Sequence, residues 1–185
     1  MAKKIVLGGL AGAVIIFFWG FVTWALTGWR AGSFQRFGNE ATVSQSIMSG
    51  AGAAGVYLFP WGMAGPGEDE AKVQAAAMKQ QEEVGFVFAV VAPKAKAEMG
   101  APMVLHVATQ FLACMLVMWL LLRSKAQTFG ERWQFVIAFG VAASIACYAP
   151  ESVWWHYPLA WTIGGIGEIT IGFALAGLAM ARIAR

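Results

Sequence analysis

Four long apolar runs alternate with short charged segments along the chain. The runs cover residues 5–26, 103–122, 133–149 and 159–181. Glu168 is the single Asp, Glu, Lys or Arg inside them. A helix needs about 20 apolar residues to cross the roughly 30 Å hydrocarbon core of a bilayer, and hydrocarbon offers no other partner to backbone N–H and C=O groups. We therefore predict an all-α membrane protein with transmembrane helices within residues 1–29, 102–123, 133–149 and 158–185.

Basic residues in the short segments predict the orientation of these helices. They are Lys3 and Lys4, then Arg123, Lys125 and Arg132, then Arg182 and Arg185. Because Lys and Arg are enriched in short cytoplasmic segments, both termini and the loop 124–132 are predicted to be cytoplasmic. Residues 30–101 and the turn 150–157 are then predicted to be outside. The first run exceeds the roughly 7–15 residues of a signal-peptide core, so we expect an uncleaved anchor.

The outer segment, residues 30–101, is too long for a featureless loop. Asn39 can start a short helix that ends near Met48, and residues 67–83 have an acidic start typical of a second helix. Residues 55–60 and 85–91 are short, aromatic and β-branched runs bounded by Gly or Pro, which indicates strands. We predict a small α/β periplasmic cap in which these strands pair antiparallel. The alternative is that the two runs lie on the membrane interface.

Composition agrees with a membrane protein and excludes other classes. The chain is 59% hydrophobic and 12% charged, whereas soluble domains carry roughly 25% charged residues. The net charge of +3 comes without a basic patch suited to a phosphate backbone, so no nucleic-acid partner is expected. The two cysteines, Cys114 and Cys147, are too few for a thiolate metal site and are expected to be packing residues.

The order of several short motifs is similar to that of a known family. After a Trp-rich first run come residues 55–60 (GVYLFP), 85–93 (GFVFAVVAP), 154–158 (WWHYP) and 175–177 (LAG). In this order they resemble a family of small bacterial four-helix inner-membrane proteins with no assigned function. The resemblance covers nearly the whole chain. It implies four transmembrane helices in a bacterial cytoplasmic (inner) membrane, and it supplies no activity and no site residues.

Glu168 is the most informative single residue. An ionisable group within a transmembrane helix costs about 2.5–3.5 kcal/mol on insertion scales and is a functional candidate by default. Its neighbours at intervals of four, Gly164, Gly172 and Ala176, are small, so we expect this face to pack against another helix. Glu168 could be a proton or cation site. It could also be a neutral carboxylic acid that is hydrogen-bonded to a neighbour such as Gln110, Thr109 or Ser144.

Two further groups of residues are candidates for a role. The two histidines could bind a ligand, and a set of small residues could pack helices together. His106 and His156 are expected at a similar depth near the outer boundary, where they could ligate a haem or a metal. No third ligand follows at a regular spacing, so no metal site is predicted and His156 also fits an interfacial aromatic belt. Small residues at helix-packing intervals recur in the first and third runs. They are Gly8, Gly12 and Gly20, and Ala138, Ala142 and Ala146.

The sequence contains no signature of an enzyme. It has no phosphate-binding loop, no paired catalytic carboxylates and no nucleophile with a base at a recognisable spacing, so neither catalysis nor a cofactor is predicted. Our leading hypothesis is a non-catalytic accessory or scaffold subunit of a larger bacterial membrane complex, for example of electron transport or photosynthesis. Its partners would be the lipid bilayer and other membrane subunits or further copies of itself. Two alternatives stay open: a small homo-oligomeric transporter or channel that uses Glu168, and a haem- or quinone-binding redox protein that uses His106 and His156.

Overall fold

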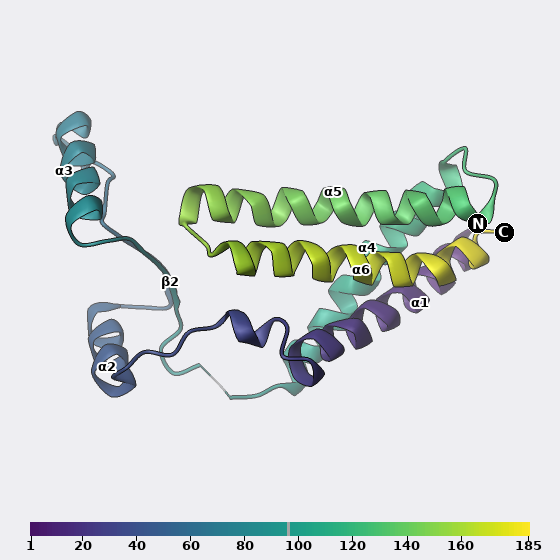
Figure 1. Ribbon diagram of the computed structural model, residues 1–185, viewed down its shortest axis with the longest axis horizontal. Coiled ribbons are helices and arrows are strands. Elements are labelled where there is room, and N and C mark those ends of the chain that lie inside the picture. The colour runs from purple at the N-terminus through teal and green to yellow at the C-terminus, as the bar shows by residue number, and fades with distance from the viewer. Residues whose placement is uncertain (96) are drawn as a thin grey trace. The chain divides into compact units, whose positions relative to one another are not determined.

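The computed structural model describes residues 1–95 and 97–185 of the chain. Within these residues it contains four helices that are long and apolar enough to cross a membrane, which confirms the prediction of four such helices. They are α1 (Ala2–Phe21, continued by a π-helical turn, η1, Val22–Leu26), α4 (Gly100–Arg123), α5 (Phe129–Trp155) and α6 (Leu159–Ile183) (Figure 1). The chain divides into two compact units, a helical unit of Met1–Gln35 with Glu98–Arg185 and a second unit of Arg36–Ala97.

In the helical unit, α1 packs against α4 and α6, and α5 packs against α6. The largest buried apolar residues at the centre of this packing are Val117, Met118, Leu121, Val136, Phe173 and Met180. At one end, Lys4 Nζ donates hydrogen bonds to the carbonyl oxygens of Ala184 at 3.3 Å and Arg185 at 2.6 Å. Residues near both ends of the chain therefore lie together, as Figure 1 shows.

Helix α5 is longer than the apolar pattern predicts. It covers Phe129–Trp155, whereas the predicted span was 133–149 followed by a turn over 150–157. At its start, Thr128 and Glu131 form a capping box in which Glu131 N donates to Thr128 Oγ1 at 3.2 Å and Thr128 N donates to Glu131 Oε2 at 3.0 Å. At its end, the helix continues through Pro150 and stops at His156, which has a left-handed φ of 56°. The prediction followed the charge-free run, but a capping box requires polar residues and so extends the helix beyond that run.

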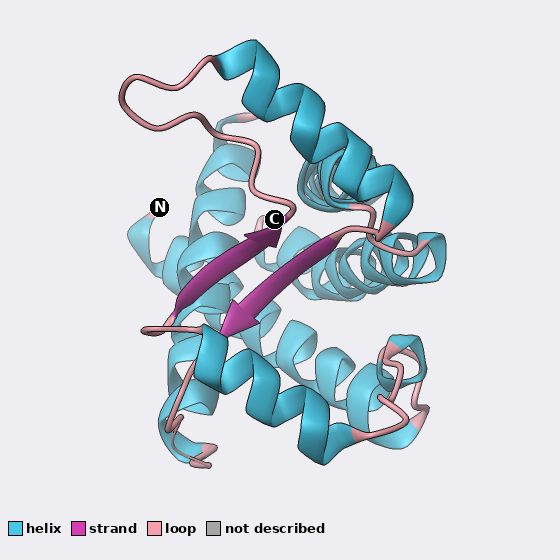
Figure 2. Ribbon diagram, turned by 90° about the vertical axis from the view of Figure 1, so that its left-hand side faces the viewer, coloured by secondary structure: helices cyan, strands magenta, loops and turns pink. Residues whose placement is uncertain are grey.

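The second unit, Arg36–Ala97, contains a two-stranded sheet and two helices. Strands β1 (Gly55–Phe59) and β2 (Val87–Val91) pair antiparallel, with Gly55 opposite Val91 and Phe59 opposite Val87 (Figure 2). Helix α3 (Glu70–Glu83) connects the strands, and α2 (Glu40–Gly50) precedes them. The predicted antiparallel strand pair with a helical connection is confirmed. A short 3-10 turn, η2 (Ala31–Ser33), belongs to the helical unit.

Side-chain caps explain where the two helices of this second unit begin. Asn39 accepts a hydrogen bond from Thr42 N at 3.2 Å at the start of α2. Asp69 accepts from Ala71 N at 3.1 Å and from Lys72 N at 3.3 Å at the start of α3. Asn and Asp are favoured at this position because their side-chain oxygens satisfy N–H groups that lack a partner within the helix. Helix α3 therefore begins at Glu70, slightly later than its predicted start at residue 67.

Candidate functional site

Glu168 lies near the middle of α6 and forms an ion pair with Arg30. Arg30 Nε lies 3.0 Å from Glu168 Oε2. Among the described residues the Nε–H has no aligned hydrogen-bond acceptor, so this contact is a charge pair more than a hydrogen bond. The second carboxylate oxygen, Oε1, accepts a hydrogen bond from Thr23 Oγ1 at 2.7 Å. The side chains of Arg30 and Glu168 are 1% and 15% exposed. These three residues, which we call the charge cluster, place two opposite charges in the interior of the helical unit.

The chain turns back after α1 and so brings Arg30 to α6. The π-helical turn Val22–Leu26 closes with Thr27 N donating to the carbonyl five residues earlier at 2.9 Å. Gly28 follows with a φ of 64°, a left-handed conformation that glycine adopts without steric cost. Arg30 N then donates to the Thr23 carbonyl at 3.2 Å. A π-helical turn changes the direction of the residues that follow it and often occurs at functional positions. Here the turn places both Thr23 and Arg30 against α6.

Aromatic rings enclose the guanidinium group of Arg30. Its Cζ lies 4.1 Å from the centroid of the Trp161 ring and 5.5 Å from those of Trp24 and Tyr148. Its Nη1 donates a hydrogen bond to the Trp161 carbonyl at 2.8 Å. A Cβ atom at Gly164 would lie 2.9 Å from Nη1, so a glycine at this position of α6 leaves room for the guanidinium group. Desolvated cation–π contacts of this kind stabilise a buried arginine by about 2 kcal/mol.

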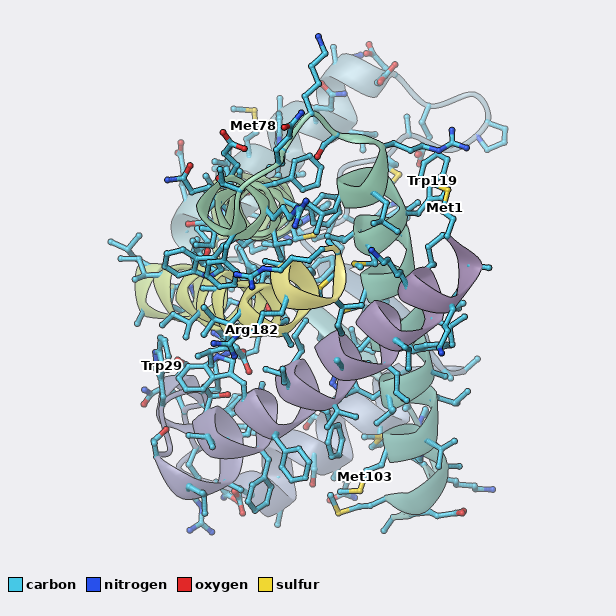
Figure 3. All side chains as sticks on the ribbon, turned by 90° about the vertical axis from the view of Figure 1, so that its right-hand side faces the viewer. Met1, Trp29, Met78, Met103, Trp119 and Arg182 are labelled. Atoms are coloured by element: carbon cyan, nitrogen blue, oxygen red, sulfur yellow. The ribbon has the colours of Figure 1, made fainter. Side chains whose placement is uncertain are left out.

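Two tryptophans lie against α6 beside the charge cluster. Trp19 Nε1 donates a hydrogen bond to the Glu168 carbonyl at 3.0 Å. The ring of Trp19 packs edge-on against that of Trp29, with the centroids 6.1 Å apart. Trp29 lies beside α6 (Figure 3), where a Cβ at Gly167 would come within 3.0 Å of its ring. Together these contacts fix the end of α1 onto α6 at the level of Glu168.

The charge cluster can hold two helices together, but its geometry restricts acid–base chemistry at Glu168. An arginine side chain stays protonated in proteins, so the positive charge beside Glu168 is permanent. Loss of either side chain would leave the other charge buried without its partner, and an uncompensated buried charge costs several kcal/mol. Both carboxylate oxygens are already in contact with Arg30 or Thr23. The arrangement therefore favours a structural ion pair that holds the end of α1 to α6.

The sequence-based partners of Glu168, namely Gln110, Thr109 and Ser144, were wrong, because its two carboxylate oxygens contact Arg30 and Thr23. Thr109 Oγ1 donates to the His106 carbonyl at 2.8 Å, and Ser144 Oγ donates to the Val141 carbonyl at 2.9 Å. Glu168 pairs instead with Arg30, which the prediction assigned to the outer segment because Arg30 follows the first apolar run. A signal for this pair was present in the sequence: an acidic residue within a span requires a compensating group, and Arg30 is the first basic residue after α1.

The two histidines are not brought together. The ring of His106, in the first turns of α4, packs against Phe17 with the centroids 6.1 Å apart. His156 is the left-handed residue that ends α5. The first turn of α4 and the last turn of α5 lie well apart in Figure 1. Within residues 1–95 and 97–185, no group of three or more His, Cys, Asp or Glu side chains forms a possible metal site.

The small residues divide into those that lie at contacts between helices and those that lie on an exposed face of α5. Cβ atoms at Gly8 and Gly12 would come within 2.7 Å of Met118 and 2.8 Å of Cys114 on α4. Gly172 faces Trp19, Ala176 is buried in the core, and a Cβ at Gly20 would lie 4.0 Å from Glu168 Oε1. The buried stripe of α5 is Val136, Gly140 and Ser144. The alanine stripe of α5, residues 138, 142 and 146, is exposed.

Comparisons of the chain with known protein families, with characterised proteins and with solved structures find no match. The resemblance to a family of small bacterial inner-membrane proteins therefore stays a prediction. Function has to be argued from the geometry of the charge cluster and of the helix surfaces.

Proposed function

We propose that this chain is a non-catalytic subunit of a larger bacterial inner-membrane assembly, in which its four long helices form a framework. The observation that carries the proposal is the ion pair between Arg30 and Glu168. Glu168 is the one acidic residue within the apolar runs, and its carboxylate is held by Arg30 Nε at 3.0 Å and Thr23 Oγ1 at 2.7 Å. An acidic residue that is used in this way joins α1 to α6 and is not available to carry an ion.

The exposed face of α5, on the side away from α6, supports a role within an assembly. Ala138, Ala142 and Ala146 recur at intervals of four and are exposed, whereas the opposite stripe of α5 is buried against α6. Small residues at this interval allow two helix backbones to approach closely in lipid, where dispersion contacts drive association. A helix of another subunit, or of a second copy of the chain, fits this face of α5.

The proposed orientation has both termini in the cytoplasm and the unit Arg36–Ala97 in the periplasm. Two contacts support it. Lys4 binds the carbonyl groups of Ala184 and Arg185, and the guanidinium of Arg182 lies 5.9 Å from the ring centroid of Phe129 at the start of α5. The basic residues near both termini and those in the α4–α5 loop therefore share one end of the helical unit. Lys and Arg favour the cytoplasmic side.

The competing function is transport of protons or cations through Glu168. Flux measurements in proteoliposomes that contain the purified protein distinguish the two. We expect no pH-dependent cation or proton flux above that of empty vesicles, either for the wild type or for Glu168→Gln. The reason is that the wild-type carboxylate is already neutralised by Arg30.

The control variant in this experiment is Glu82→Gln, which removes an exposed carboxylate from α3. A wild-type flux that persists in the Glu82→Gln variant and disappears in the Glu168→Gln variant would contradict the proposed framework role. Such a result would assign transport to Glu168. Circular dichroism of each reconstituted variant shows whether the helices are retained.

A further inference from the structure

One end of the helical unit carries a concentration of positive charge. Three chain segments meet there, and Figure 3 shows this end with Met1, Trp119 and Arg182 labelled. The basic residues of these segments are Lys3, Lys4, Arg123, Lys125, Arg132, Arg182 and Arg185. Glu131 is their one acidic residue, and its Oε2 accepts hydrogen bonds from Gln127 N at 2.7 Å and Thr128 N at 3.0 Å. This carboxylate therefore serves as a helix cap.

Arg182 and Arg185 both lie beside one aromatic ring at this end. Their guanidinium carbons lie 5.9 Å and 5.6 Å from the centroid of the same ring, that of Phe129. Lys4 Nζ reaches the backbone of the same turn through the Ala184 and Arg185 carbonyls. Among the described residues, neither arginine has a carboxylate within ion-pair distance. Two like charges held beside one ring repel each other, and an anion bound against both of them would offset this repulsion.

An apolar stripe on α6 ends at this pair of arginines. Ile171, Leu175 and Leu178 are 38%, 38% and 39% exposed and lie on one face of the helix with Arg182, at intervals of four, three and four residues. From Ile171 to Arg182 the helix rises about 16 Å, at about 1.5 Å per residue. One leaflet of the bilayer contributes about 15 Å of hydrocarbon. The stripe therefore matches the depth of one leaflet, and Arg182 lies where the headgroups begin.

We propose that this surface is a binding site for an anionic phospholipid. Arg182 and Arg185 bind the headgroup phosphate, Lys4 adds a third positive charge, and an acyl chain lies along Leu178 and Leu175. The occupant has to be an amphiphile, because the site combines a cationic end with an apolar stripe one leaflet long. It has to carry net negative charge, because the local charges are positive and Glu131 is used as a cap. This inference does not depend on the proposed subunit role.

Native mass spectrometry tests the site directly. The purified protein in a neutral detergent is titrated with phosphatidylglycerol and, separately, with phosphatidylcholine of the same acyl chains. We expect phosphatidylglycerol adducts at lower lipid concentration than phosphatidylcholine adducts. In the double variant Arg182→Gln/Arg185→Gln, the half-saturating concentration of phosphatidylglycerol should rise by about fivefold for each guanidinium removed.

The matched control is Arg36→Gln/Lys79→Gln, which removes two positive charges that are paired with carboxylates in the unit Arg36–Ala97. We expect this variant to bind phosphatidylglycerol as the wild type does. The proposal is overturned if both double variants lose binding equally, since net charge alone would then explain the preference. It is also overturned if Arg182→Gln/Arg185→Gln binds unchanged, or if inorganic phosphate displaces the lipid, which would indicate a site for free phosphate.

Discussion

Arg30 and Glu168 form an ion pair in the interior of an apolar helical unit, and either residue alone would destabilise that unit. Burial of the pair costs desolvation energy for both ions, and their attraction offsets this cost only when hydrogen bonds and good geometry accompany it. The structure supplies these through Thr23, through the Trp161 carbonyl and through three aromatic rings around the guanidinium. The pair therefore specifies how the end of α1 joins α6, even where its net contribution to stability is small.

A double-mutant cycle measures this coupling. Arg30→Met and Glu168→Leu each leave one buried charge without its partner, so each should lower the free energy of unfolding by about 3 kcal/mol. The double variant replaces both charges with apolar groups of similar size and should lose much less than the sum of the two single changes. Unfolding in a detergent titration, followed by circular dichroism, gives the three values. Additive losses would show that the two residues do not interact.

At the scale of the helices, contacts depend on glycines that let backbones approach closely. The clearest case is Gly140 of α5, where a Cβ would lie 2.5 Å from the Cβ of Phe173 on α6. Because the Cβ of Phe173 is attached directly to the backbone, rotation of the side chain cannot relieve this contact. The two helices would have to move apart, and the packing of α5 on α6 would be lost in part.

Gly140→Ala is therefore expected to lower the free energy of unfolding by about 1–3 kcal/mol, the usual cost of overpacking a filled interior. Gly20→Ala in α1 is the matched control, because its Cβ would have its nearest neighbour at 4.0 Å. The control should be neutral or stabilising by up to about 1 kcal/mol, since alanine favours a helix more than glycine does. Equal losses in the two variants would contradict the close contact between α5 and α6.

Local patterns in the sequence predict the elements better than they predict the site. The apolar runs predicted the four long helices, and short aromatic and β-branched runs bounded by Gly or Pro predicted the antiparallel pair of β1 and β2. The partner of Glu168 was missed because Arg30 lies 138 positions earlier in the chain and is placed by a π-helical turn. The ends of α5 were missed because a capping box and a proline inside the helix do not follow from hydropathy.

At the scale of the whole molecule, the helical unit pairs Glu168 with Arg30 and leaves one face of α5 exposed. The charge cluster closes α1 onto α6, α5 packs on α6, and the alanine stripe of α5 is exposed. The unit Arg36–Ala97 joins the end of the first long helix to the start of the second along the chain. This combination supports the proposed framework role, in which the exposed face of α5 contacts another membrane helix.

Native mass spectrometry tests this role most directly. The protein is first extracted in a mild detergent from its native membrane. The measurement reports the stoichiometry and the masses of any partners that are retained. We expect the chain in complexes that contain other polypeptides. The chain alone, or a closed ring of identical copies, would contradict the subunit role.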